Sequence, residues 1–259
     1  MKRKFIFVMC PPFQGSTVIV NLLNSSSNVS TFLDCKKTSR GEGQWLYKYH
    51  GDVNYENNRW NPKYRLDMNM VNKVFNTYLD KNKQIWVEKS PPNICRAKQF
   101  QDYFSKLGEV YFIISIRNPY SASNNAEEWV KYANFQKKNI ETLKNRIYVT
   151  YEECCKNLDK VILKFTNRIP GLGTIYNNSI TSIDNERCTK IHTNKVDRIL
   201  DKEKKNKILK KNLHIVKYFN YTIIDNNTKI NMDSLITEYH NMKGLSDDFQ
   251  EFVRNKNNV

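Results

Sequence analysis

The stretch FIFVMCPPFQGSTVIVNLL (residues 5–23) places an apolar run, a glycine turn and a second apolar run in direct succession. The first run, 5–9, is short and unbroken, which is typical of a buried strand in a parallel sheet. The second, 18–23, is apolar enough to begin a helix that packs back on the sheet. A strand, a turn at Gly15 and a helix N-terminus direct backbone N–H groups at one point, which favours an anion. Ordinary strand-to-helix junctions have the same form, so both interpretations stay open on this stretch alone.

Strand-like and helix-like segments alternate along the rest of the chain. The expected strands are 84–87, 110–116 and 147–151, and helices are expected around 68–79, 95–106, 124–146 and 196–218. This alternation predicts an α/β fold: a P-loop-like parallel sheet with helices on both faces and right-handed crossovers. We expect a nucleotide-binding domain over residues 1–220. A polar helical extension is expected over 221–259.

The chain is strongly basic. Its 259 residues carry a formal net charge of +16, which favours acidic partners such as nucleotides, acidic peptides or glycans. The segment DKEKKNKILKK (201–211) is interpreted as a helix with a solvated lysine face. Basic residues are dispersed and no groove-reading motif is present, so a nucleic-acid partner is not expected. No run of 18 or more apolar residues is present, so a membrane span is not expected either.

The cysteines give no sign of a metal site. There are six, with no CxxC pair and no histidine at zinc-ligand spacing. The N-terminal segment is basic and then apolar, but its apolar run stops at a double proline, so we interpret it as the first strand. Together these features favour a reducing compartment, and the expected location is cytoplasmic.

Three strand ends carry groups suited to anions. In open parallel sheets, ligands bind at the carboxyl ends of the strands. The loop after the first strand lacks the lysine of a Walker A motif, which disfavours a kinase or NTPase of the usual kind. Lys89 follows the strand at 84–87, and Arg117 follows the strand at 110–116. Each alone is compatible with a surface salt bridge, but together they favour two phosphate positions on one nucleotide.

Four segments, in this order, resemble the PAPS-dependent sulfotransferases, which use 3′-phosphoadenosine 5′-phosphosulfate as co-substrate. They are FIFVMCPPFQGSTVIVNLL, VEKSPPN, YFIISIRNPYSASNN and YVTYEECCKNLDKVI. The resemblance covers about residues 4–220 and is densest before residue 165.

The resemblance implies a sulfotransferase fold, PAPS as co-substrate and no metal. It implies that the loop around the 5′-phosphosulfate is formed by Gln14, Gly15, Ser16 and Thr17. Arg117 and Asn125 match the positions that hold the 3′-phosphate, and Tyr151 matches the tyrosine beside the adenine.

The catalytic pair is also implied by the resemblance. The segment GEGQWL (41–46) resembles the tyrosylprotein and heparan types, in which a glutamate at this place acts as general base. Glu42 is therefore the candidate base, and a carboxylate near an acceptor hydroxyl can remove its proton during transfer. Lys89 matches the lysine that stabilises charge on the departing phosphate.

The sequence departs from the family in the phosphosulfate loop. Lys or Arg is usual where Phe13 stands, and serine is usual at the positions of Gln14 and Asn125. Lys89, or a later lysine such as Lys190 or Lys195, is a candidate to replace the missing loop cation.

The sequence therefore predicts a sulfotransferase that moves a sulfuryl group from PAPS to a hydroxyl or amine of a glycan, peptide or small molecule. The alternatives are a degenerate P-loop nucleotide kinase-like transferase and a non-catalytic binder of nucleotides or polyanions. Loops 36–66 and 167–195 are expected to line the acceptor pocket. The aromatic residues of the first loop are interpreted mainly as packing groups: Trp45, Tyr47, Tyr49, Tyr55 and Trp60.

Overall fold

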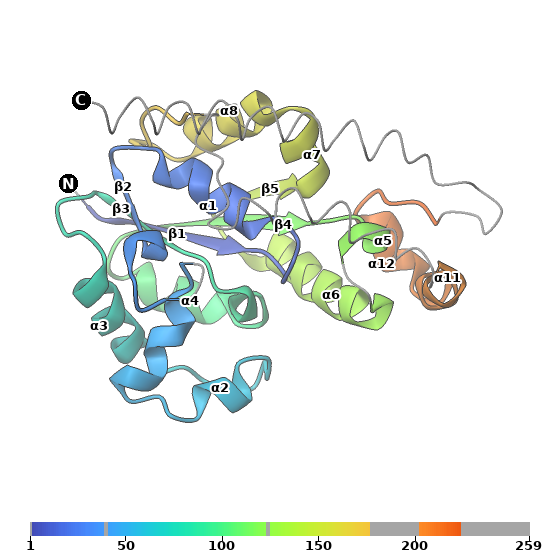
Figure 1. Cartoon of the computed structure of the whole chain (residues 1–259), viewed down its shortest axis with the longest axis horizontal. Helices are drawn as coiled ribbons and strands as arrows, with labels where there is room; N and C mark the ends of the chain where they lie inside the picture. Colours follow the sequence, from blue (N-terminus) through green and yellow to red (C-terminus); the bar gives the residue numbers. More distant parts are fainter. Residues whose placement is uncertain (1, 39–40, 123–124, 177–201, 224–259) are drawn as a thin grey trace.

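A five-stranded parallel sheet forms the centre of the computed structural model, with strand order β2-β3-β1-β4-β5 (Figure 1). The structure describes residues 2–38, 41–122, 125–176 and 202–223. The strands are β1 (Lys4–Met9), β2 (Val29–Thr31), β3 (Ile85–Glu88), β4 (Glu109–Ile116) and β5 (Arg146–Thr150). The predicted α/β fold with a parallel sheet is confirmed.

Strand β1 lies at the middle of this sheet and is buried along its whole length. Phe5 pairs with Trp86 of β3 on one side and with Val110 of β4 on the other. Its side chains alternate between two hydrophobic clusters, with Phe7 in one and Ile6 in the other. The continuous apolar run is thus explained by burial on both faces of the sheet.

Helices cover both faces (Figure 1). One face is covered by α1 (Ser16–Asn24), α7 (Tyr151–Lys156) and α8 (Leu158–Arg168). The other is covered by α3 (Met68–Tyr78), α4 (Ala97–Phe104) and α6 (Ala126–Thr142). The amphipathic pattern of α3 is typical of a helix with one face on a sheet: Met70, Val71, Val74 and Phe75 are buried.

A third cluster lies beyond the carboxyl end of β4. It joins α6 to α5 (Pro119–Ala122), α11 (Lys202–Lys211) and α12 (Leu213–Tyr218). The interpretation of 201–211 as a solvated lysine face is wrong at one position, since Lys205 is only 2% exposed. Its Nζ donates to the carbonyl of Tyr120 at 3.3 Å, because this side of α11 packs on the chain that follows β4.

Two local features differ from the sequence prediction. Strand β2 was not predicted, since it has only three residues and pairs at the sheet edge with β3. The fifth strand ends at Thr150, so Tyr151 begins α7 instead of ending the strand. The reason is a capping box, in which the Thr150 side chain accepts from the N–H of Glu153 and the Glu153 carboxylate accepts from the N–H of Thr150.

Two other expectations concern the ends of the described chain. Residues 177–201 and 224–259 lie outside the described residues, so most of the expected extension at 221–259 and its domain boundary stay predictions. Among the helices that the structure describes, none is long and apolar enough to cross a lipid bilayer.

Candidate active site

The loop between β1 and α1 is shaped by Gly15. This residue is the N-cap of α1 and has a φ of 95°. Because glycine has no side chain, no cap side chain accepts from the N–H groups of the first turn. A Cβ atom at Gly15 would lie 2.3 Å from Cδ2 of Tyr151. Glycine is therefore required here both by the left-handed backbone and by the tyrosine ring. Ser16 and Thr17 open the helix beside this cap.

Arg117 joins this loop to the end of β4. Its backbone N–H donates to Gln14 Oε1 at 3.0 Å, and its Nη1 donates to the Phe13 carbonyl at 3.3 Å. Its Nε donates to Ser121 Oγ at 3.1 Å, and its guanidinium lies 3.8 Å from the Tyr151 ring centroid. The structure thus brings together Gln14, Gly15, Arg117 and Tyr151, which the sequence predicted as one site.

Gln14 supplies a further donor at the same place. Its side chain is fully buried, and within the described chain its Nε2 has no hydrogen-bond partner. Buried amide groups without a partner are rare and costly, by about 1–3 kcal/mol. The orphaned amide beside a helix N-terminus and an arginine therefore fits an anionic ligand.

Asn125 has a different setting from the other predicted ligands. It is exposed and is the N-cap of α6, where its Oδ1 accepts from the N–H groups of Glu127 at 2.9 Å and Glu128 at 3.4 Å. The side-chain oxygen of Asn125 thus accepts hydrogen bonds from the first turn of α6. Only the N–H groups of its side-chain amide can donate to a phosphate.

Phe13 stands where the resemblance expects a cation. Its φ is 61° and its side chain is 62% exposed, whereas its carbonyl accepts from Arg117. Lys190 and Lys195, the candidates from the C-terminal half, lie outside the described residues.

The second part of the site is a buried ion pair at the end of β3. Lys89 Nζ and Glu42 Oε1 are 3.2 Å apart, with the Lys89 side chain 2% exposed. The other oxygen of Glu42 accepts from Gln44 Nε2. Glu42 directly precedes the 3₁₀ helix η2 (Gly43–His50). The pair therefore joins the loop before η2 to Lys89, which follows β3.

Glu88 is a functional candidate that the sequence analysis missed. It is 1% exposed and accepts from Ser90 Oγ and Asn93 Nδ2. Burial raises its pKa to about 7, the Ser90 hydrogen bond lowers it, and the nearby Glu42 charge raises it. The signal in the sequence was a glutamate at the end of an otherwise apolar strand.

Ser90 links Glu88 to the loop that bears the candidate base. Its Oγ donates to Glu88 and accepts from the N–H of Gln44 at 3.1 Å. Because Gln44 in turn bonds to Glu42, a continuous chain of hydrogen bonds fixes Glu42 relative to β3.

The two parts of the site meet around Cys10, just after β1. Burial raises the pKa of the Cys10 thiol to about 12, whereas the charges of Lys89 and Arg117 lower it. Lys89 follows β3 and Arg117 follows β4, and both of these strands pair with β1, so the two cations flank the end of β1 that Cys10 continues.

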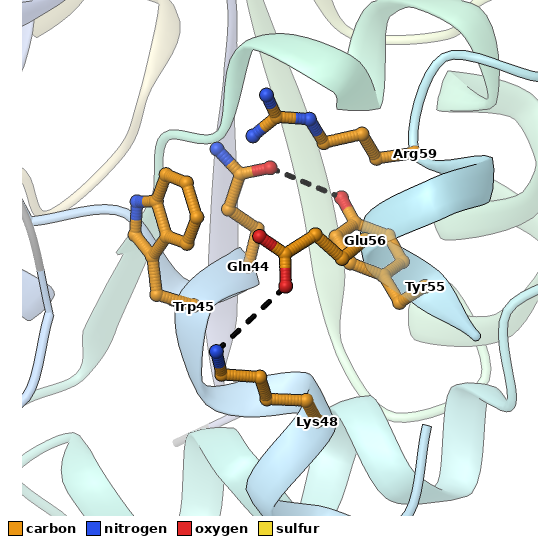
Figure 2. Close-up of a pocket in the computed structure, with 6 residues that line it drawn as sticks. All are labelled: Gln44, Trp45, Lys48, Tyr55, Glu56 and Arg59. Carbon is orange, nitrogen blue, oxygen red and sulfur yellow. Dashed lines mark hydrogen bonds and ion pairs between the residues drawn. The ribbon is translucent and has the colours of Figure 1, made fainter. Parts of the chain in front are cut away.

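A small hollow lies beside η2 (Figure 2). It is lined by Gln44, Trp45, Lys48, Tyr55, Glu56 and Arg59, all from the first predicted acceptor loop. Tyr55 and Glu56 belong to the short helix α2 (Tyr55–Asn58). Most of the aromatic residues in this loop do pack: Tyr47 and Tyr55 are buried, and Trp60 contacts Tyr132 at a centroid distance of 5.0 Å. Tyr49 is exposed.

The polar groups of the site are of kinds that bind anions and move protons. They are amides, hydroxyls, two cations and two carboxylates. In the part of the chain that the structure describes, no group of three or more His, Cys, Asp or Glu side chains is arranged to hold a metal ion.

Solved structures with a similar fold include two sulfotransferase domains. One is a sulfotransferase domain from the curacin biosynthetic pathway, with a TM-score of 0.50 and 15% sequence identity; the match covers 86% of this chain and 99% of that chain. The other is a sulfotransferase domain from the Synechococcus PCC 7002 olefin synthase, with a TM-score of 0.39, 15% identity, and coverage of 69% and 77%. No protein-family model and no curated protein matches the sequence.

The curacin-pathway similarity shows that the chain has the fold of a sulfotransferase domain. Neither neighbour is named as a tyrosylprotein or heparan sulfotransferase. The resemblance to those types stays a prediction.

Proposed function

We propose that this protein is a PAPS-dependent sulfotransferase. The observation that carries the proposal is the clustering of two kinds of chemistry at neighbouring strand ends. Arg117 and the Gln14–Gly15 turn form an anion-suited cluster at β1 and β4, and the Glu42–Lys89 pair lies at the end of β3. A sulfotransferase needs both, since it binds a doubly phosphorylated nucleotide and removes a proton from an acceptor.

The nucleotide end would hold PAPS as follows. The N–H groups at the start of α1 and the side-chain amide of Gln14 attract negative charge. They would donate hydrogen bonds to the 5′-phosphosulfate. Arg117 would bind the 3′-phosphate with Asn125, and Tyr151 would lie beside the adenine, as the family resemblance implies. Because Tyr151 already contacts both Gly15 and Arg117, it would fix the spacing between the two anion sites.

The transfer end would carry out the chemical step. The acceptor oxygen attacks the sulfur, an oxygen–sulfur bond forms, and the bond between sulfur and the bridging phosphate oxygen breaks. Glu42 takes the acceptor proton, and Lys89 stabilises the negative charge on the departing 3′-phosphoadenosine 5′-phosphate. Lys89 is paired with Glu42 at 3.2 Å, so during transfer its ammonium would exchange the carboxylate for the departing phosphate.

The assignment of Glu42 as base supports a reaction type like that of tyrosylprotein and heparan sulfotransferases. An acceptor with a hydroxyl or amine suits this base equally. No metal is needed, because Lys89, Arg117 and the helix amides supply the positive field.

Calorimetric titration with 3′-phosphoadenosine 5′-phosphate tests the nucleotide site. We expect wild type to bind with a micromolar Kd and Arg117→Ala to bind at least about 100-fold more weakly, as is typical for loss of a buried cation that pairs with a phosphate. Arg146→Ala is the matched control, because Arg146 lies exposed at the amino end of β5. It is expected to bind like wild type.

Transfer is then measured with radiolabelled PAPS and a panel of acceptors. Labelled product that requires Glu42 supports the full proposal. Nucleotide binding without transfer to any acceptor favours the non-catalytic binder, and no binding in wild type overturns the proposal.

A further inference from the structure

The helix η2 begins without a hydrogen bond from the side chain of its own N-cap residue. Glu42 occupies that position, but its side chain accepts nothing from the first turn of the helix. Its carboxylate instead faces Lys89 Nζ at 3.2 Å and accepts from the Nε2 of Gln44. A polar side chain at an N-cap ordinarily accepts from the N–H groups of the first turn, which otherwise lack a partner. The first N–H groups of η2 therefore need an acceptor from another part of the chain.

The end of β3 supplies these acceptors. The N–H of Gln44 donates to Ser90 Oγ at 3.1 Å. The N–H of Gly43 donates to the carboxylate of Glu88, which lowers the pKa of that carboxyl group. A Cβ atom at Gly43 would lie 3.3 Å from Glu88 Oε1 and 3.0 Å from Phe32 Cε2, so the absence of a side chain allows this close approach. Two residues of a distant segment thus cap η2.

Glu88 and Ser90 are themselves fixed in place. Glu88 is 1% exposed and Ser90 is fully buried. The Ser90 hydroxyl and the Nδ2 of Asn93 donate to the Glu88 carboxylate, and the N–H of Asn93 donates to the Ser90 carbonyl at 2.9 Å. Asn93 lies in the 3₁₀ helix η3 (Pro91–Cys95), which follows directly in the chain. These buried hydrogen bonds hold the start of η2 in one position relative to β3.

We propose that Glu88 and Ser90 are positioning residues for Glu42. Because they cap η2 in its place, the Glu42 carboxylate is not drawn back to its own helix and stays free to face Lys89. Without them, the N–H groups of the first turn and the Lys89 ammonium compete for the same carboxylate. This inference rests on the proposed sulfotransferase function, in which Glu42 is the base, and adds two residues to that same site.

The Lys89 ammonium reports on the position of Glu42 without nucleotide or acceptor. A buried ammonium exchanges its protons slowly with water, so we expect Lys89 to give a resolved nitrogen–proton NMR signal in the full chain. The signal is identified by its loss in Lys89→Arg. Glu42→Gln removes the charged partner and defines the position of the signal for an unpaired Lys89. Ser90→Ala is expected to move the signal at least about half of the way to that position, because Glu42 then turns to η2.

Ser26→Ala is the matched control. Ser26 is 3% exposed, and its Oγ donates to the Leu172 carbonyl and accepts from the N–H of Asn28 at 3.3 Å. The Ser90 hydroxyl likewise donates one hydrogen bond and accepts one from a backbone N–H. Ser26 lies between α1 and β2, at the end of α1 away from the candidate site. We expect both serine variants to lower the urea midpoint of unfolding by similar amounts, and only Ser90→Ala to move the Lys89 signal.

Two further variants complete the test. Ser90→Cys replaces Ser90→Ala if the alanine variant does not fold, because a thiol fills the space of the hydroxyl but is a weak hydrogen-bonding group. It is expected to move the Lys89 signal in the same direction. Glu88 is tested through the N–H of Gly43, whose exchange with solvent should be at least about tenfold faster in Glu88→Gln, because an amide oxygen is a weaker acceptor than a carboxylate. Equal exchange in wild type and Glu88→Gln removes Glu88 from the cap.

Transfer kinetics test the consequence for the reaction. With labelled PAPS and an acceptor, Ser90→Ala is expected to lower kcat about 10–100-fold, because a reacting group displaced by about 1 Å loses much of its catalytic benefit. The KM for PAPS should stay within about twofold of wild type, since the nucleotide end is untouched. A merely structural role of Ser90 predicts instead that Ser26→Ala lowers kcat by as much.

The outcomes separate this inference from the proposed function. A Lys89 signal that stays in place in folded Ser90→Ala or Ser90→Cys, or a wild-type spectrum without that signal, overturns the inference even if the protein transfers sulfate. Equal kcat in wild type and Ser90→Ala, with transfer that requires Glu42, also overturns it. A signal that moves as expected in a protein that binds no 3′-phosphoadenosine 5′-phosphate supports the positioning of Glu42 and rejects only the sulfotransferase.

Discussion

The two ends of the candidate site are built in different ways. At the nucleotide end, Tyr151 contacts both Gly15 and Arg117, and the donors are backbone N–H groups, the Gln14 side-chain amide and one arginine. At the transfer end, Glu42 and Lys89 form a buried ion pair next to a second buried carboxylate, Glu88. The first end is fixed by close packing around a glycine, and the second by hydrogen bonds among charged side chains.

This difference implies that the two ends respond to different perturbations. A change in shape should damage the nucleotide end, because its contacts leave no room beside the tyrosine ring. A change in charge or protonation should damage the transfer end, because its carboxylates lie in a medium that solvates charge poorly.

Neutralising the candidate base is the strongest test of this separation. Glu42→Gln keeps the shape but removes the proton acceptor, so we expect kcat to fall about 10²–10⁴-fold, as is typical for loss of a general base. The Kd for 3′-phosphoadenosine 5′-phosphate should change less than about twofold, since Glu42 lies at the transfer end. Steady-state kinetics and calorimetry measure the two quantities.

Glu109→Gln is the control for that experiment, because Glu109 pairs with Lys4 where both strands begin. It should leave kcat unchanged. A Glu42→Gln enzyme that loses nucleotide affinity and turnover together would show that the two ends are not separate.

Adding one methyl group should damage the nucleotide end. Gly15→Ala forces a left-handed backbone, which costs about 1–2 kcal/mol, and it places a Cβ 2.3 Å from the Tyr151 ring, which adds about 1–3 kcal/mol of overpacking. We expect the free energy of unfolding to fall by about 2–5 kcal/mol and nucleotide binding to be lost. Urea denaturation measures the first and calorimetry the second.

Gly51→Ala isolates the backbone contribution. Gly51 has a φ of 115°, and a methyl group added there would meet no atom within 4 Å, so only the backbone cost of about 1–2 kcal/mol applies. If the two alanine variants lose equal stability, the contact with Tyr151 does not constrain the loop.

The smallest expected effect concerns the protonation of Glu88. Its pKa is raised by burial from its ordinary value of 4.5 to about 7. The native protein thus keeps a proton that the unfolded chain has released, so the free energy of unfolding falls as pH rises from about 4.5 to about 7. The contribution of this one group to that fall is about 3 kcal/mol at most.

Glu88→Gln should remove this part of the pH dependence, because glutamine has the size of the acid but no ionisable group. Denaturation curves at pH 5 and pH 8 in wild type and variant give the difference. Glu109→Gln should keep the wild-type slope. If the free energy of unfolding of Glu88→Gln depends on pH as it does in wild type, Glu88 is ionised in the native protein. The transfer end would then not be more sensitive to protonation than the nucleotide end.

The sequence was sufficient for the features that depend on local pattern. The sheet strands at Phe5, Val110 and Ile147 are short apolar runs bounded by turn residues, and these runs predicted them. The turn at Gly15 and the cation at Arg117 each follow a strand directly, so the rule for strand ends placed them at one edge.

Features that depend on contacts between distant segments were not predicted. Glu88 looked like an ordinary strand-end acid, because its partners Ser90 and Asn93 become partners only when the next segment turns back. Burial of Lys205 depends on contact with Tyr120, which lies more than 80 positions away in the sequence. Strand β2 is too short for periodicity and is defined only by its pairing with β3.

The position of β1 also has a consequence for how the chain folds during synthesis. Lys4 is made well before Ile85 and Glu109, yet it pairs with both of them. At about 5–20 residues per second, roughly 5–20 seconds pass between translation of β1 and translation of β4. For that interval β1, which is buried along its whole length in the folded protein, has no neighbour on the β4 side, and such long-range parallel pairing folds slowly. The emerging chain is therefore expected to depend on chaperones that shield Lys4–Met9 until β4 has been made and can pair with it.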